Sequence, residues 1–106
     1  MATIAIDIDK DRLRAFCKKW KITEFALFGS AVRPEEFRAD SDVDVLVSFA
    51  PDSPVWTFAA WIEMRDELIA IFGREVDVVE RSGLARMRNY LRRDAIVNTA
   101  VLLDVA

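Results

Sequence analysis

The chain has 106 residues, 53% of them apolar and 31% charged, which is enough for one hydrophobic core and too few for two. We therefore expect a single domain over residues 1–106, without a further domain to grip a large acceptor. The net charge of −3 argues against binding along a nucleic-acid backbone, which requires a strongly basic face.

Two residue types narrow the chemistry further. Histidine is absent, which excludes histidine-ligated zinc and histidine-activated nucleophiles. The one cysteine, Cys17, cannot form an internal disulfide and is expected to pack inside a helix. No apolar run is long enough to cross a bilayer and no signal-like segment opens the chain, so we expect a cytoplasmic protein without a membrane partner.

The first half of the chain alternates helix and strand. Apolar residues at helical spacing predict a helix over residues 9–20, with lysines at its C-terminal end. A strand is predicted over residues 23–28 and ends at Gly29. Residues 31–38 are predicted to form a short helix or a loop, and the second strand is predicted over residues 43–49.

The second half continues the alternation. Residues 51–54 are rich in proline and polar side chains and predict a turn, followed by an unusually apolar helix over residues 55–72 that Gly73 ends. A third strand is predicted over residues 75–79 and one or two short helices after it. Residues 101–103 form either a short edge strand or the end of a helix. The whole pattern predicts an α/β (α+β) protein in which helices flank a small mixed sheet.

Carboxylates gather where the strands begin. Side chains alternate along a strand, so Asp42 and Asp44 point to one side while Val43 points into the core. Asp77 lies alone in the third strand, which can bring it to the same place if the two strands are neighbours. Converging carboxylates repel one another unless a hard cation lies between them, and oxygen-only sites suit Mg²⁺ or Mn²⁺.

Two features of the predicted surface each allow two interpretations. Four arginines surround Tyr90, namely Arg86, Arg88, Arg92 and Arg93. They form either a solvated helix face, which is the ordinary case, or a contact for nucleotide phosphates or an acidic partner. The helix over residues 55–72 has more apolar surface than one side of a small sheet covers, so Trp56 or Trp61 is a candidate docking surface.

A set of residues along the first three strands carries a family resemblance. The set is Gly29, Ser30, Arg33, Asp42, Asp44 and Asp77. In this order it resembles the signature of the polymerase-beta-like nucleotidyltransferases. The short chain is similar to their minimal members, the MNT antitoxins that are usually encoded beside a HEPN-domain toxin. The resemblance is close from about Phe25 to Val79 and covers the rest in outline.

The resemblance implies the polymerase-beta-like fold and a metal-dependent reaction. Asp42, Asp44 and Asp77 would be the catalytic residues and would hold two Mg²⁺ ions, or Mn²⁺, with ATP as the substrate. Asp77 would complete the site for the metal that activates the attacking hydroxyl, and is a candidate acceptor for its proton.

Nucleotide binding is implied for the glycine turn and the arginine that follows it. Gly29 has no Cβ, so backbone N–H groups can approach the triphosphate, and the Ser30 hydroxyl is one more donor. Arg33 would pair with a phosphate oxygen, as the matching arginine does in the family. Pro34 departs from the family by replacing the glycine that usually follows, and it restricts Arg33 to extended backbone angles, which leaves the role of Arg33 open.

The function implied by the resemblance is that of an antitoxin enzyme. It would transfer AMP from ATP to a tyrosine hydroxyl of a cognate HEPN ribonuclease toxin and release pyrophosphate. The alternative is a non-catalytic antitoxin that neutralises the toxin by direct binding. A transferase acting on RNA ends or on a small-molecule hydroxyl is less favoured, because the chain lacks a basic face and a second domain. Either a homo-oligomer or a hetero-oligomer fits the sequence.

Overall fold

A computed structural model describes residues 8–33, 35–38, 40–84 and 86–106. Within these residues, four strands form a mixed sheet in the order β3-β2-β1-β4. The strands are β1 (Ile22–Phe28), β2 (Val43–Phe49), β3 (Val76–Glu80) and β4 (Val101–Leu102). β1 runs antiparallel to both of its neighbours, whereas β2 and β3 are parallel. The predicted mixed sheet with flanking helices is confirmed.

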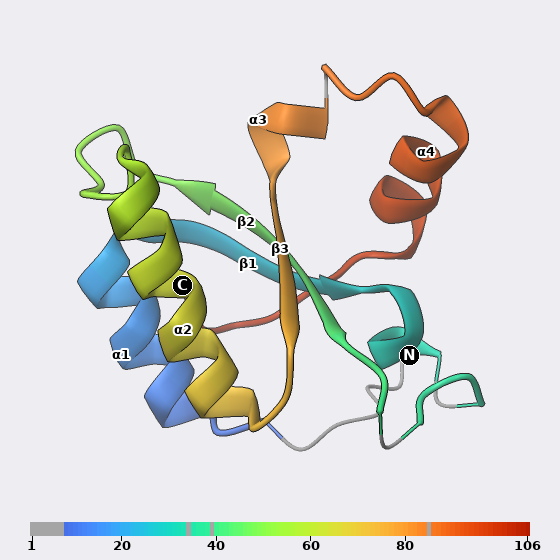
Figure 1. Ribbon diagram of the computed structural model, residues 1–106, viewed down its shortest axis with the longest axis horizontal. Coiled ribbons are helices and arrows are strands. Elements are labelled where there is room, and N and C mark those ends of the chain that lie inside the picture. Colours follow the sequence, from blue (N-terminus) through green and yellow to red (C-terminus); the bar gives the residue numbers. More distant parts are fainter. Residues whose placement is uncertain (1–7, 34, 39, 85) are drawn as a thin grey trace.

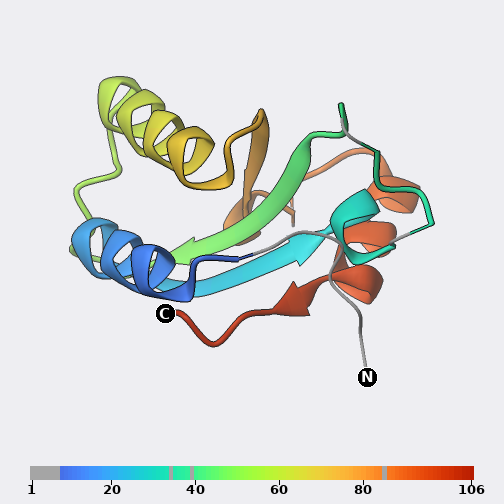
Figure 2. The ribbon, with the colours of Figure 1, turned by 90° about the horizontal axis from the view of Figure 1, so that it is seen from below.

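The helices gather at two ends of the sheet. They are α1 (Lys10–Trp20), α2 (Phe58–Phe72), α3 (Arg81–Leu84) and α4 (Tyr90–Thr99), with a 3₁₀ turn η1 (Gly29–Val32) directly after β1. α1 and α2 lie side by side at one end of the molecule, and α4 lies at the other (Figure 1). Figure 2 shows η1 beside α4, and these two elements are in contact.

Both faces of the sheet are covered, because side chains alternate along each strand. On one face, Val45 and Val47 of β2 are fully buried in a large core with side chains of α1 and α2. On the other face, Leu46 packs with Leu84 of α3 and Ile96 of α4 in a smaller core. β2 is therefore an internal strand with apolar neighbours on both faces. Asp44, near its start, is the exception among these side chains.

α1 forms as the sequence predicts. Asp9 caps its N-terminus by accepting a hydrogen bond from the Arg12 backbone N–H at 3.1 Å, and Lys21 closes it in the left-handed region at a φ of 54°. Leu13 and Cys17 face the core. Cys17 is 1% exposed, as expected for a packing residue, and burial raises the pKa of its thiol to about 12.

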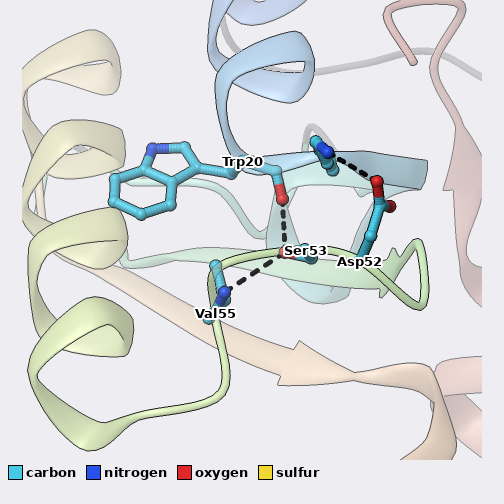
Figure 3. A network of polar contacts seen from close by, with 5 residues as sticks. Trp20, Asp52, Ser53 and Val55 are labelled. Carbon is cyan, nitrogen blue, oxygen red and sulfur yellow. Dashed lines mark hydrogen bonds and ion pairs between the residues drawn. The ribbon is translucent and has the colours of Figure 1, made fainter.

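The apolar helix is shorter than the prediction of residues 55–72, because α2 begins three residues later. Thr57 caps it with a hydroxyl oxygen that accepts a backbone N–H at 3.1 Å. The preceding turn is held by Ser53 (Figure 3), whose hydroxyl donates to the carbonyl of Trp20 at 2.6 Å and accepts from the N–H of Val55 at 3.3 Å. Val55 is thus held in this turn, ahead of the N-cap of α2.

The remaining differences are small. β3 begins and ends one residue later than predicted, and Gly73 ends α2 in the left-handed region at a φ of 70°, as predicted. The choice left open for residues 101–103 is settled in favour of a short edge strand, since Leu102 pairs with Ala26 of β1. No helix in the described part of the chain is long and apolar enough to span a membrane.

The two tryptophans of the apolar segment have different surroundings. Trp61 packs edge-on against Phe49, with ring centroids 6.3 Å apart. Trp56 is 84% exposed and Phe58 is 80% exposed, so two large aromatic side chains form the exposed apolar surface at the start of α2. Of the two candidates for a docking surface, the structure therefore favours Trp56.

Candidate active site

The parallel pairing of β2 with β3 brings two of the predicted carboxylates together. Asp44 and Asp77 are direct partners in the register of the two strands. Their neighbours Val43 and Val76 are buried in the large core, so the two aspartates lie on the opposite face, toward α4. Asp44 is half-buried and Asp77 is exposed.

Asp42 and the glycine turn complete this edge of the sheet. Asp42 lies two residues before Asp44, directly ahead of β2, and is exposed. Phe28, the last residue of β1, is the partner of Asp44 on its other side, so the turn at Gly29 begins beside that carboxylate. Ser30 follows in η1 and is half-buried.

Gly29 is required at its position for two reasons. Its φ of 67° lies in the left-handed region that side chains disfavour. A methyl group at Gly29 would collide with Oδ2 of Asp44 and lie 3.2 Å from its Cγ. The missing side chain thus leaves the space that the Asp44 carboxylate occupies, and the two sequence motifs form one structural unit.

The charges around Asp44 act on one another. Burial raises the pKa of the Asp44 carboxyl, and the negative charges of Asp77 and Asp42 raise this pKa further. The positive charges of Arg92 and Arg33 oppose that rise. The three aspartates therefore share one electrostatic environment, in which an added cation would relieve repulsion.

Arg92 is a member of this site that the sequence named only as one of four arginines. Its Nη2 lies 3.4 Å from Oδ2 of Asp77. Asn89 caps α4 by accepting the backbone N–H of Arg92 at 3.1 Å, which fixes the first turn of the helix over the sheet edge. No local signal distinguishes Arg92 from its neighbours, because its position depends on how α4 packs.

Arg33 has a weaker connection to the site. It is exposed at the end of η1 and forms an ion pair with Glu36. Its charge still acts on Asp44, but no direct contact joins the two. Pro34, which the sequence places beside it as a departure from the family, lies outside the described residues.

The three carboxylates are chemically suited to a divalent cation, but their side chains do not converge on one point in this structure. Across the described residues, no three acidic side chains stand close enough to form a ready-made cation site. Asp44 and Asp77 are adjacent through their strands, while Asp77 faces a guanidinium. Carboxylate oxygens are the donors that Mg²⁺ and Mn²⁺ prefer, and Asp77 becomes available to such an ion once the arginine moves away.

A separate hollow lies between α1 and α2 and holds none of the candidate residues. It is lined by Phe16, Lys19, Glu67 and Ile71, among others. Phe16 and Ile71 belong to the large core, which is on the face of the sheet away from Asp44 and Asp77. The candidate site is instead open, at the edge where β2 and β3 begin and beside η1 and α4.

A comparison with models of protein families identifies the domain. The model of the nucleotidyltransferase domain family matches residues 10–102, so the chain belongs to that family. This confirms the family resemblance seen in the sequence. The matched segment includes each of the six predicted site residues and also Arg92.

Two curated relatives are archaeal. Protein adenylyltransferase MntA of Thermococcus cleftensis is 37% identical over 67 residues, which cover 63% of this chain and 64% of the relative. A candidate protein adenylyltransferase of Methanocaldococcus jannaschii is 32% identical over 66 residues, covering 62% of this chain and 64% of the relative. The chain thus spans 64% of the length of each relative it matches.

Solved structures share the fold. A protein described as a candidate minimal nucleotidyltransferase is 26% identical, with a TM-score of 0.65 over 89% of this chain and 88% of its own. A toxin–antitoxin solved with AMP-PNP is 21% identical, with a TM-score of 0.64 over 90% of this chain and 72% of its own. The second likeness establishes the fold alone.

Proposed function

We propose that this chain transfers AMP from ATP to a tyrosine hydroxyl of a cognate HEPN ribonuclease toxin and thereby acts as an antitoxin. The observation that carries the proposal is the pairing of Asp44 with Asp77 against the open turn at Gly29. Membership of the nucleotidyltransferase domain family supports it, as do relatives named protein adenylyltransferases. Neighbours described as toxin–antitoxins support the choice of a toxin as acceptor.

In the proposed reaction, the acceptor hydroxyl oxygen attacks the α-phosphorus of ATP. A new oxygen–phosphorus bond forms, the bond to the bridging oxygen of the β-phosphate breaks, and pyrophosphate leaves. The hydroxyl proton passes to a carboxylate, for which Asp77 is suited because it is exposed beside the site. The turn at Gly29 presents backbone N–H groups to the triphosphate, and Ser30 adds its hydroxyl.

Asp42, Asp44 and Asp77 would hold the divalent metal, with Mg²⁺ as the expected ion and two ions as the expected number. Such a metal would supply positive charge to offset the negative charge that develops on the attacking and leaving oxygens. The residues themselves keep the site in one place: β2 fixes Asp44, β3 fixes Asp77 opposite it, and Gly29 leaves room for the Asp44 carboxylate.

A second candidate function is neutralisation by binding alone. The apolar surface of Trp56 and Phe58 favours it, since large exposed apolar side chains often mark protein interfaces. This surface lies at the start of α2, at the other end of the molecule from α4 (Figure 1). A docking surface and an enzymatic site can therefore coexist in one chain.

One experiment separates the two functions. A purified HEPN-domain protein, the proposed partner, is incubated with this chain, ATP and Mg²⁺, and is then separated from it. The enzymatic function predicts a gain in mass by whole AMP units and a loss of ribonuclease activity that persists after separation. Inhibition that is unchanged in EDTA and disappears on separation would instead establish neutralisation by binding.

A further inference from the structure

Arg92 contacts a residue that the proposed reaction needs for another purpose. Its guanidinium lies 3.4 Å from the Asp77 carboxylate, yet Asp77 is one of the proposed metal ligands. A guanidinium and a metal ion both require the negative charge of the same carboxylate oxygens. They therefore compete for Asp77, and the arginine must change partner when the metal binds.

The exchange is easy because the pair is exposed. The side chain of Arg92 is 54% exposed and that of Asp77 is 52% exposed, so water screens their attraction. Forming an exposed ion pair of this kind changes an equilibrium constant by a factor of about five at most. Arg92 acts as a weak substitute for a cation at Asp77 and does not lock the site.

The position of α4 supplies the second partner. α4 packs against η1, which begins at Gly29 and holds Ser30, so the helix that carries Arg92 contacts both Asp77 and the turn proposed to receive the triphosphate. A guanidinium has a planar fork of donors that matches two phosphate oxygens, and such charge-assisted hydrogen bonds are strong. Its neighbour Arg93 is engaged elsewhere, stacked on Tyr90 and paired with Asp94.

We propose that Arg92 is a nucleotide-binding residue that pairs with Asp77 in the free protein and with the triphosphate once a divalent cation occupies the carboxylates. The inference rests on the proposed function, because it takes Asp77 as a metal ligand. It makes α4 part of the nucleotide site and predicts that the metal and the nucleotide bind cooperatively. One role opposes the metal and the other assists the nucleotide, so removing Arg92 has two effects of opposite sign.

The test measures both affinities for the Arg92→Ala variant. Mn²⁺ binding to the nucleotide-free protein, followed by electron paramagnetic resonance, should tighten by about two- to five-fold, because its competitor is gone. Binding of α,β-methylene-ATP at saturating Mg²⁺, followed by calorimetry, should weaken by about ten-fold or more, because a charge-assisted hydrogen bond is lost. Arg92→Lys keeps the charge without the fork and should give intermediate values for both.

Arg93→Ala is the matched control and should change neither affinity by more than about two-fold, because Arg93 is paired with Asp94 and stacked on Tyr90, away from Asp77. If Arg92→Ala leaves both affinities unchanged, or weakens both together, the inference is wrong although the proposed function stands. If the wild-type protein binds neither Mn²⁺ nor the analogue, both the inference and the proposed function are wrong. Asp44→Asn should lose Mn²⁺ binding in the same assay, which confirms that the signal comes from the carboxylate site.

Discussion

Replacing Gly29 with alanine tests whether the glycine turn and Asp44 form one unit. The φ of 67° at Gly29 lies in the left-handed region, where a residue with a Cβ costs about 1–2 kcal/mol. The new methyl group would also collide with Oδ2 of Asp44. Turning that carboxylate away from its rotamer costs about 0.5–1.5 kcal/mol. We expect the free energy of unfolding to fall by roughly 1.5–3.5 kcal/mol in total.

Gly73→Ala is the matched control for the backbone cost. Gly73 has a φ of 70°, but no other atom lies within 4 Å of the position that its Cβ would take. Its replacement should therefore cost only the backbone strain of about 1–2 kcal/mol. In thermal unfolding, Gly29→Ala should lower the Tm by about 6–14 °C, against about 4–8 °C for Gly73→Ala.

A double variant isolates the collision itself. When Asp44 is also replaced by alanine, the carboxylate is gone, and the added cost of Gly29→Ala should fall to that of Gly73→Ala. Urea unfolding of the four proteins in this cycle measures the coupling free energy. If Gly29→Ala costs no more than Gly73→Ala in the wild-type background, Asp44 does not lie against the turn, and our description of the site is wrong.

Three further predictions concern charge, surface and burial. Because the pKa of Asp44 is raised on folding, its favourable contribution is complete at low pH and is lost as the pH rises through the folded-state pKa. Without metal, the Asp44→Asn variant should thus have the same Tm as wild type at neutral pH or a higher one. Its Tm should also fall less than that of wild type when the pH is raised from acid to neutral. Clear destabilisation at pH 7 would mean that Asp44 is a structural residue. Trp56→Ser should weaken binding to the HEPN partner, measured by calorimetry, and leave the Tm nearly unchanged, whereas Trp61→Ser should lower the Tm. The reverse pattern would rule out Trp56 as part of the docking surface. Cys17 should resist a thiol reagent at pH 8 until the protein unfolds, because burial raises its pKa to about 12, and rapid labelling of the native protein would show that it is accessible.

The sequence predicted what depends on local geometry. Alternation along a strand placed Asp42 and Asp44 on one side, and the bounds of β2 agree with the predicted residues 43–49. Gly73 was assigned as the end of α2 from the conformational freedom of glycine alone. The order of the short motifs was enough to identify the family, which the match over residues 10–102 confirms.

What the sequence could not predict depends on contacts between distant segments. The register that sets Asp44 opposite Asp77 requires β2 and β3 to be parallel neighbours, which alternation within one strand does not determine. The turn ahead of α2 is held by a hydrogen bond between Ser53 and Trp20, 33 residues apart, which no local pattern indicates. The place of Arg92 at Asp77 depends on the packing of α4 on the sheet. The roles of the carboxylates in metal binding stay a prediction.

The most direct test of the proposed transfer follows the two ends of ATP separately. The HEPN partner is incubated with this protein, Mg²⁺ and ATP that carries a radioactive label at either the α- or the γ-phosphate. The partner is then denatured, and the radioactivity bound to it is counted. We predict label on the partner from the α-position only, release of the γ-label as pyrophosphate, and no labelling with Asp44→Asn. Label from the γ-position would indicate phosphoryl transfer, and α-labelling that persists with Asp44→Asn would contradict the assignment of this site.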